Sequence, residues 1–324
     1  MKENERAVCA WCNEGNSVAL FKIKDVFEES WEICHCTQCQ AYFLSPKPTE
    51  EQLARAYSAD YYGEGEEKFE GLIEKMLDRF RQGRAKRLAR LMNNRGKLLD
   101  IGCGNGRFLQ YVSQYGQIDM FGIEMAGGSA NRAKRISDLN LKIGVLKDGD
   151  FEDSFFDAIS MIHVFEHLSN PMKTMDIIDQ ILKPGAVLLL SFPNIDSIQA
   201  RFFKGSWLHL DAPRHLFFFG PVQFKKLMKN RGYEFIYEKY FSPEYNPYGA
   251  QQSWLNRWLK KREILYEHLK GNHNYCKEYS QFNLLLQKSF VSVTFPLFVL
   301  TDIIASFVHR SATVELAFRK KSKS

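Results

Sequence analysis

The chain has 324 residues, of which 45% are hydrophobic and 25% are charged. These proportions are ordinary for globular proteins and exclude a disordered or a collagen-like chain. The 44 Lys and Arg residues exceed the 38 Asp and Glu residues, which gives a formal net charge of +6 at pH 7. This mild surplus permits an acidic partner but does not by itself indicate nucleic acid.

The seven cysteines are unevenly distributed, and five of them lie within the first 39 residues. The N-terminus is polar and lacks the apolar stretch of a signal peptide, so a metal site is favoured over disulfides. Cys9-x2-Cys12 and Cys36-x2-Cys39 have the spacing of two zinc knuckles. We expect these four thiolates to hold a structural zinc ion in a ribbon-like module over residues 1–45. Cys34 and His35 are spare candidates that could exchange with Cys36, and free buried cysteines are the alternative.

Residues 46–96 form a predicted helical connector between this module and the rest of the chain. Thr49 is placed to cap a short helix, and Gln52 lies at the capping-box position. A longer helix is expected over Phe69–Met92, where apolar residues recur at helical spacing. The sequence Asn-Asn-Arg-Gly that follows is a plausible helix stop.

Over residues 97–241 short apolar runs alternate with helical stretches such as 128–137 and 171–183. Such alternation predicts an α/β domain with a parallel sheet and crossover helices. Two later runs, 233–241 and 312–319, alternate with a period of two and are expected to form late, antiparallel strands. The segment 242–311 is then an apolar helical insert, and residues 312–324 hold the last strand and a basic tail.

A glycine-rich turn follows the first predicted strand of this domain. Gly102, Gly104 and Gly106 permit backbone angles and close approach that a β-carbon would block. Glu124 ends the next strand, where a carboxylate can accept hydrogen bonds from both ribose hydroxyls of a nucleoside. Asp100, just before the turn, disfavours a diphosphate and favours a cationic amino acid. This charge argues against a nicotinamide or flavin dinucleotide, whose pyrophosphate lies at this turn.

The segment LLDIGCGNGRFL resembles the first motif of class I S-adenosylmethionine-dependent methyltransferases. The segments GIE, FDAISMIHVFEHLSNP, ILKPGAVLLLSFPN and DAPRHLFFF follow in the order that this family uses, so that the resemblance covers roughly residues 97–241. It implies a Rossmann-like, seven-stranded sheet with S-adenosylmethionine across its carboxyl edge. It also places Asp100 and Gly102 beside the methionine part and Glu124 at the ribose, and it offers Leu146 for adenine.

The segment from His163 to His167 resembles the E-x-x-E-H segment of ubiquinone-biosynthesis O-methyltransferases, with His163 in place of the first Glu. That resemblance implies a divalent cation, and the alternative is that the segment caps the following helix. Methyl transfer to oxygen needs a base, and histidine titrates near neutral pH. His163 and His215 are the candidate bases. Arg214 either holds an anionic substrate group or pairs with Asp211.

Residues 290–308 are almost uniformly apolar, and their length is borderline for a membrane span. Pro296 and Asp302 weaken a spanning interpretation, and so does a following strand that would rejoin the sheet. A lid over the substrate, a homodimer face and peripheral contact through 242–311 with the inner face of a membrane are the alternatives. The basic residues of the insert and of the tail suit an anionic membrane surface.

Together these features predict a cytoplasmic S-adenosylmethionine-dependent methyltransferase that acts on a small-molecule, sugar or lipid-linked acceptor, with O-methylation favoured. The order of ribbon, connector and core resembles a bacterial group encoded with surface polysaccharide and lipid biosynthesis. An RNA base methyltransferase is the alternative among enzymes. The ribbon lacks a basic stripe, which argues against nucleic acid, and Ser191–Asn194 departs from the asparagine-proline-proline signature. A non-catalytic S-adenosylmethionine-binding regulatory protein is the alternative of another class.

Overall fold

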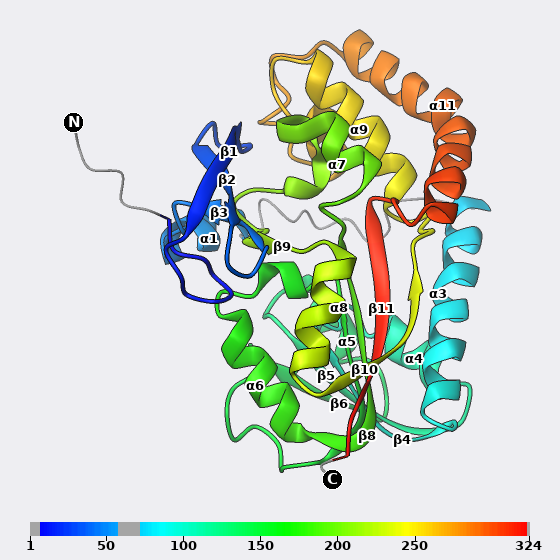
Figure 1. The fold of residues 1–324 in the computed structure, drawn as a ribbon. Helices are drawn as coiled ribbons and strands as arrows, with labels where there is room; N and C mark the ends of the chain where they lie inside the picture. The colour runs from blue at the N-terminus through cyan, green and yellow to red at the C-terminus, as the bar shows by residue number, and fades with distance from the viewer. Residues whose placement is uncertain (1–6, 58–71, 323–324) are drawn as a thin grey trace. The chain divides into compact units, whose positions relative to one another are not determined.

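The computed structural model describes residues 7–57 and 72–322, and side chains from residue 77 onward in the second range (Figure 1). The chain divides into two compact units, each built from separated stretches of sequence. One unit comprises residues 1–70, 193–221 and 240–314, and the other comprises residues 71–192, 222–239 and 315–324. The five-part division expected from the sequence stays a prediction.

The second unit is built on a seven-stranded sheet in the order β10-β11-β8-β7-β4-β5-β6. In chain order the strands are β4 (Arg95–Ile101), β5 (Gln117–Glu124), β6 (Leu139–Ile143), β7 (Phe156–Ile162), β8 (Leu182–Pro193), β10 (Tyr233–Lys239) and β11 (Thr313–Lys320). The five strands from β4 to β8 are mutually parallel, whereas β10 and β11 pair antiparallel. This mixed sheet confirms the predicted Rossmann-like arrangement, with β10 at the edge and β11 beside β8.

One helix precedes these strands, and others connect them. They are α3 (Leu72–Leu91), α4 (Arg107–Ser113), α5 (Gly128–Ala133), the 3-10 turn η1 (Phe165–His167), α6 (Pro171–Ile181) and α8 (Pro221–Asn230). The predicted helix over Phe69–Met92 corresponds to α3, and its first three residues lie outside the described part of the chain. Leu98 of β4, Leu109 of α4 and Leu189 of β8 lie in one buried apolar cluster, so the sheet and its helices share a core.

The first unit contains a four-stranded antiparallel sheet in the order β1-β2-β3-β9. Its strands are β1 (Ser17–Lys24), β2 (Ser30–Cys36), β3 (Tyr42–Ser45) and β9 (Phe217–Phe218). Helix α1 (Glu50–Ala56) follows and begins with the predicted capping box, in which Thr49 and Gln52 exchange hydrogen bonds. The pairing of β9 with β3 joins the N-terminal module to a segment about 170 residues later in the chain.

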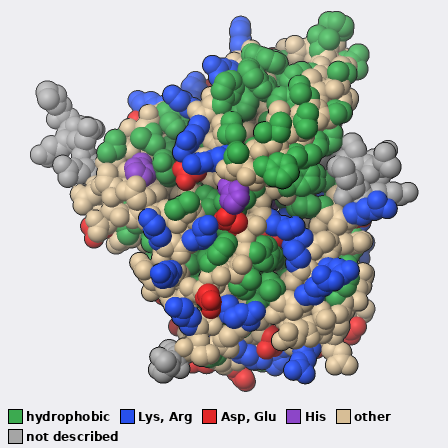
Figure 2. Space-filling model, turned by 45° about the vertical axis from the view of Figure 1, so that its right-hand side comes forward, with side chains coloured by type: hydrophobic (Ala, Val, Ile, Leu, Met, Phe, Trp, Pro, Cys, Tyr) green, Lys and Arg blue, Asp and Glu red, His purple; other side chains and the backbone are tan. Residues whose placement is uncertain are grey.

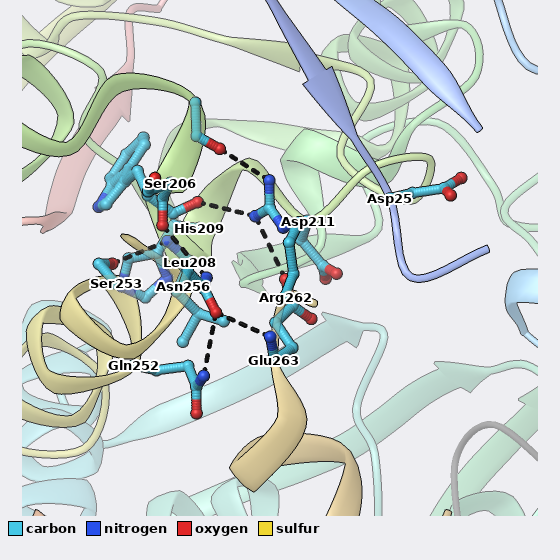
Figure 3. Close-up of polar contacts among 12 residues, drawn as sticks. Asp25, Ser206, Leu208, His209, Asp211, Gln252, Ser253, Asn256, Arg262 and Glu263 are labelled. Atoms are coloured by element: carbon cyan, nitrogen blue, oxygen red, sulfur yellow. Dashed lines mark hydrogen bonds and ion pairs between the residues drawn. The ribbon is translucent and has the colours of Figure 1, made fainter. Parts of the chain in front are cut away.

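The insert between β10 and β11 is helical, as predicted. It contains α9 (Asn246–Trp258), α10 (Ile264–Leu269) and α11 (Gln281–Phe307). Earlier in the chain, between β8 and β9, lie α7 (Ile198–Phe203) and the 3-10 turns η2 (Lys204–Ser206) and η3 (Leu208–Leu210). One side of α9 is buried and polar: Ser253 accepts a hydrogen bond from the Leu208 amide, and Asn256 donates to the Ser206 carbonyl (Figure 3). These bonds hold α9 against η2 and η3.

Candidate cofactor-binding turn, acid–base residues and cysteine cluster

The turn after β4 carries three glycines in the left-handed region, with φ of 71° at Gly102, 59° at Gly104 and 77° at Gly106. A β-carbon on Gly102 would lie 2.3 Å from a methyl carbon of Val164, and one on Gly106 would lie 2.4 Å from Ile136 Cδ1. A β-carbon on Gly104 would meet nothing within 4 Å. Packing therefore requires the outer two glycines, while the middle one leaves room for a ligand to approach the main chain.

Glu124 ends β5 beside this turn. Its Oε2 accepts a hydrogen bond of 2.7 Å from the Gly104 amide, and its Oε1 accepts one of 3.0 Å from the Met125 amide. Burial raises the pKa of Glu124, and the two amide donors oppose that shift. The carboxylate is thus fixed at the turn, in an orientation set by the backbone.

Asp100 lies near the end of β4 and is only 3% exposed. Its Oδ1 accepts a 2.6 Å hydrogen bond from the Ser160 hydroxyl, and burial raises its pKa to about 7. Ser160 was not predicted as a site residue, although it is a polar residue within the apolar run of β7 and lies opposite Asp100 in the strand register. A buried carboxyl with a raised pKa is the kind of group that a nearby cation would ionise.

Leu146 lies in the loop after β6 and is half-buried. The start of this loop is joined to the end of β5 by a 2.9 Å hydrogen bond from the Gly144 amide to the Glu124 carbonyl. The loops after β4, β5 and β6 therefore meet at the carboxyl edge of three adjacent strands. This edge of a parallel sheet is where α/β proteins bind nucleoside ligands.

His163 directly follows β7 and has a left-handed φ of 55°. Its amide donates a 2.8 Å hydrogen bond to the Ser191 carbonyl of β8. Its imidazole Nδ1 lies 3.3 Å from a carboxylate oxygen of Glu166, which is 1% exposed, and its Nε2 lies 3.4 Å from the Ser191 hydroxyl. A carboxylate against Nδ1 favours the tautomer in which Nε2 is the basic nitrogen.

His215 belongs to the other unit and is buried there. Its Nδ1 donates a 2.7 Å hydrogen bond to the His209 carbonyl, and its Nε2 lies 3.6 Å from Asp211 Oδ2. Arg214, also buried, pairs with the same aspartate. Arg214 was expected either to hold an anionic substrate group or to pair with Asp211, and the structure shows the pairing with Asp211.

The four predicted cysteine ligands form one cluster, in which all sulfur atoms lie within 4.8 Å of one another. Cys9 and Cys39 have their sulfurs 3.6 Å apart, and Cys12 and Cys36 have theirs 3.5 Å apart. Zinc–sulfur bonds of about 2.3 Å in a tetrahedron separate the sulfurs by roughly 3.8 Å, so the cluster is compatible with zinc. Cys34 also lies on β2 but is not a member of this cluster.

The methyltransferase-domain family model matches residues 72–238, which is 167 of the 324 residues. The chain belongs to this methyltransferase family. The matched segment includes β4 to β8, the glycine turn and the His163 region.

Two curated relatives are ubiquinone biosynthesis O-methyltransferases. The protein of Saccharophagus degradans is 29% identical over 104 residues, and the mitochondrial protein of Dictyostelium discoideum is 27% identical over 112 residues. Each match covers 30% of this chain, and it covers 44% and 35% of the respective relatives. The likeness thus spans less than half the length of either relative.

Among solved structures, a protein assigned as a sarcosine dimethylglycine methyltransferase from Galdieria sulphuraria superposes with a TM-score of 0.51. The match covers 84% of this chain and 98% of that protein, at 14% sequence identity. At this identity the match supports the fold of the seven-stranded unit.

Proposed function

We propose that this protein is an S-adenosylmethionine-dependent methyltransferase that modifies an oxygen atom of a small-molecule acceptor. The observation that carries the proposal is the turn after β4. There the space beside the Gly104 α-carbon is empty to 4 Å, and the Gly104 amide donates a 2.7 Å hydrogen bond to the carboxylate of Glu124. Membership of the methyltransferase family supports the reaction, and similarity to ubiquinone biosynthesis O-methyltransferases over about 30% of the chain favours oxygen as the acceptor atom.

The residues of the turn suit the parts of this cofactor. Glu124 is placed to accept hydrogen bonds from ribose hydroxyls, and Gly102 and Gly104 allow the ligand to lie against the main chain. Asp100 supplies a negative charge for the cationic methionine part, and Leu146 offers an apolar side chain for adenine. When bound, S-adenosylmethionine supplies a methyl group activated by a sulfonium sulfur.

His163 is the base that we favour. Its Nδ1 faces the buried carboxylate of Glu166, which holds the imidazole in place and stabilises the proton that Nε2 would accept from an acceptor hydroxyl. The nearby Ser191 hydroxyl lies within reach of Nε2 and orients it further. His215 is the second candidate base. Its Nδ1 donates a hydrogen bond to a backbone carbonyl, so its Nε2 is the nitrogen that could accept a proton.

We further propose that the cysteine cluster holds zinc in a structural role. Four sulfur ligands complete a tetrahedron and leave no position for a substrate. Cys9 and Cys12 precede β1, while Cys36 ends β2 and Cys39 precedes β3, so a shared ion would join the ends of the small sheet. The acceptor that we propose is a small molecule, which includes a free sugar or a lipid-linked intermediate, and we propose that the reaction takes place in the cytoplasm.

The reaction is tested by incubating the purified protein with deuteromethyl-labelled S-adenosylmethionine and separate lipid, glycan, small-molecule and RNA fractions. We expect label in a non-RNA fraction, measured by mass spectrometry. The His163→Ala variant should transfer label at least tenfold more slowly while still binding the cofactor, because removing a general base typically costs about 10²–10⁴-fold.

A matched control is His273→Ala, since His273 is exposed in the loop after α10 and lies outside the methyltransferase segment. Label in RNA alone would contradict the acceptor class. Cofactor binding without transfer to any fraction would contradict the catalytic role and favour a regulatory protein.

A further inference from the structure

One face of helix α11 is buried against the protein, and the other face is apolar and exposed. The residues that face the protein recur at spacings of three and four and include Leu284, Gln287, Asp302 and Ala305, all of which are buried. The other face carries the exposed apolar side chains Phe282, Leu285, Leu286, Val293, Leu297, Leu300, Ile304 and Phe307. These also recur at helical spacing, and Val293 and Phe307 are 78% and 79% exposed. At 27 residues the outer face is about 40 Å long.

Polar contacts hold the inner face of α11 to its own unit. Gln251 of α9 donates hydrogen bonds to the Val291 carbonyl at 2.7 Å and to the Thr294 hydroxyl at 2.8 Å. Asp302 accepts a 2.9 Å hydrogen bond from the Asn246 side chain, near the first turn of α9. These contacts involve both the middle and the C-terminal part of α11, so the helix lies along α9 and presents only its outer face.

The hydrogen bonds between α11 and α9 limit the ways in which α11 could interact with a membrane. Among the described residues, α11 is one helix that is long and apolar enough to cross a bilayer, by length and composition alone. A crossing helix would expose Asp302 and Gln251 to lipid or break their hydrogen bonds, and a buried polar group left unpaired is costly. The outer face can instead enter the headgroup boundary while the inner face keeps its partners.

An aromatic cluster continues the apolar surface from α11 onto α9 and α7. The Phe290 ring lies 5.5 Å from the ring of Trp258, which is 60% exposed. Trp254 lies 5.1 Å from Trp258 and 5.3 Å from the ring of Phe202, which is half exposed. Tryptophan beside an apolar helix is typical of membrane–water boundaries, where one part of the ring is buried and another is wet.

Basic side chains border the same surface. Arg257 lies over the Phe202 ring at 5.3 Å, and Lys204, Lys260 and Lys288 are exposed nearby in the chain. Within α11 itself the charged residues are Lys288, which is exposed, and Asp302, which is buried. The space-filling view shows apolar side chains gathered over the upper part of the molecule, with Lys and Arg side chains beside them (Figure 2). The border of the apolar face is therefore positively charged.

We propose that the outer face of α11 docks this protein on an anionic lipid surface, with the helix lying along the membrane. Large exposed apolar faces mark interaction sites, and the basic border selects the partner. Two copies meeting through this face would bring their basic borders together, whereas acidic headgroups complement them. This docking is independent of the proposed reaction, because it involves only the surface of α11, α9 and the α7 segment.

The test is flotation of the 324-residue chain with vesicles of phosphatidylcholine alone or with about one third phosphatidylglycerol. We expect flotation with the anionic vesicles and much weaker flotation with the neutral ones. The double variant Val293→Asp/Ile304→Asp places two acids on the outer face and should lower partitioning at least tenfold. The control Val18→Asp/Val222→Asp places two acids on exposed valines of β1 and α8 and should float like the wild type.

A second pair of variants tests the basic border. Lys260→Glu/Lys288→Glu should lower binding to anionic vesicles by roughly fivefold or more for each lost lysine at low salt, and the matching Arg variants should retain it. Circular dichroism and thermal melts confirm that each variant is folded. The proposal is overturned if the wild type does not float with anionic vesicles or if the Val293→Asp/Ile304→Asp variant floats with them as the wild type does. It is also overturned if light scattering shows a dimer that this variant dissociates while no vesicle binds.

Discussion

Asp100 is a buried carboxyl whose pKa lies near 7 because burial disfavours its charged form. A cationic ligand beside it stabilises the ionised form, so binding releases a proton when the free carboxyl is protonated. Affinity should then rise with pH up to about 7 and level off above it. We expect the affinity for S-adenosylmethionine to increase about tenfold between pH 6 and pH 8 in calorimetric titrations.

The control for this prediction is Asp100→Asn, which keeps the shape of the side chain and removes its titration. The variant should bind more weakly, and it should lack the rise that the wild type shows in this window. Equal pH dependence in both proteins would show that Asp100 does not face the cationic part of the ligand.

Gly104→Ala and Gly102→Ala should both destabilise the protein, but to different degrees and for different reasons. Gly104→Ala places a methyl group where nothing lies within 4 Å, so it should abolish cofactor binding and lower stability by about 1–2 kcal/mol, the cost of a left-handed alanine. Gly102→Ala adds a clash with Val164 and should destabilise the protein further.

Urea unfolding and cofactor titration of the two variants separate these effects. If Gly104→Ala bound S-adenosylmethionine as the wild type does, the ligand would not approach the turn at this residue.

At the scale of elements, Glu315 of β11 ties α3 to the last two strands. Its carboxylate pairs with Arg84 and Arg87 of α3 and accepts a 2.9 Å hydrogen bond from the Tyr237 hydroxyl of β10. Burial opposes ionisation of Glu315, but the two arginines outweigh it and hold its pKa below the usual value. Glu315→Gln removes the negative charge that both guanidinium groups contact and should destabilise the protein by about 3 kcal/mol.

The control is Glu234→Gln, an exposed residue of β10, which should change stability by less than about 0.5 kcal/mol. The contribution of Glu315 is present above the unfolded pKa of about 4.3 and is lost as the pH falls through the lower folded value. Chemical unfolding of both proteins at pH 7 and at a series of pH values below 4 measures it. A variant as stable as the wild type at pH 7 would contradict this role.

A second prediction at the scale of elements concerns the four-cysteine cluster of the N-terminal module. Cys36→Ser removes one of the four sulfur ligands, so purified protein should contain little zinc and should melt at a lower temperature. Cys34→Ser changes a buried cysteine two residues away on the same strand, outside the cluster. Elemental analysis should find about one zinc per chain in the wild type and in Cys34→Ser. Full zinc occupancy of Cys36→Ser would show that this sulfur is not a ligand.

At the scale of the whole molecule, much of the sheet could be predicted from sequence. The apolar runs that became β4, β5, β7 and β8 are bounded by glycine or polar residues, and alternation with helices implies parallel pairing. The site residues on the glycine turn could be named for the same reason, since a turn between a strand and a helix brings Asp100 and Gly104 to the carboxyl edge.

Other features depend on contacts between residues far apart in the chain. Strand β9 has two residues and forms only because Phe217 and Phe218 meet β3, so no local pattern marks it. The Asp302 carboxylate accepts hydrogen bonds from Asn246 and from the Ser242 amide, 56 and 60 residues earlier, and the acid appears in sequence only as an interruption of an apolar run. Ser160 was missed because its role depends on the register between β4 and β7.

The most direct test of the cofactor site is calorimetric titration of the 324-residue chain with S-adenosylmethionine, alongside the variants Glu124→Gln and Asp119→Asn. Both acids lie on β5, but Glu124 is held at the glycine turn and Asp119 is exposed. We expect one molecule bound per chain in the wild type and in Asp119→Asn, and at least tenfold weaker binding in Glu124→Gln. Absence of binding in the wild type, or equal affinity in all three proteins, would contradict the assignment of this turn as the cofactor site.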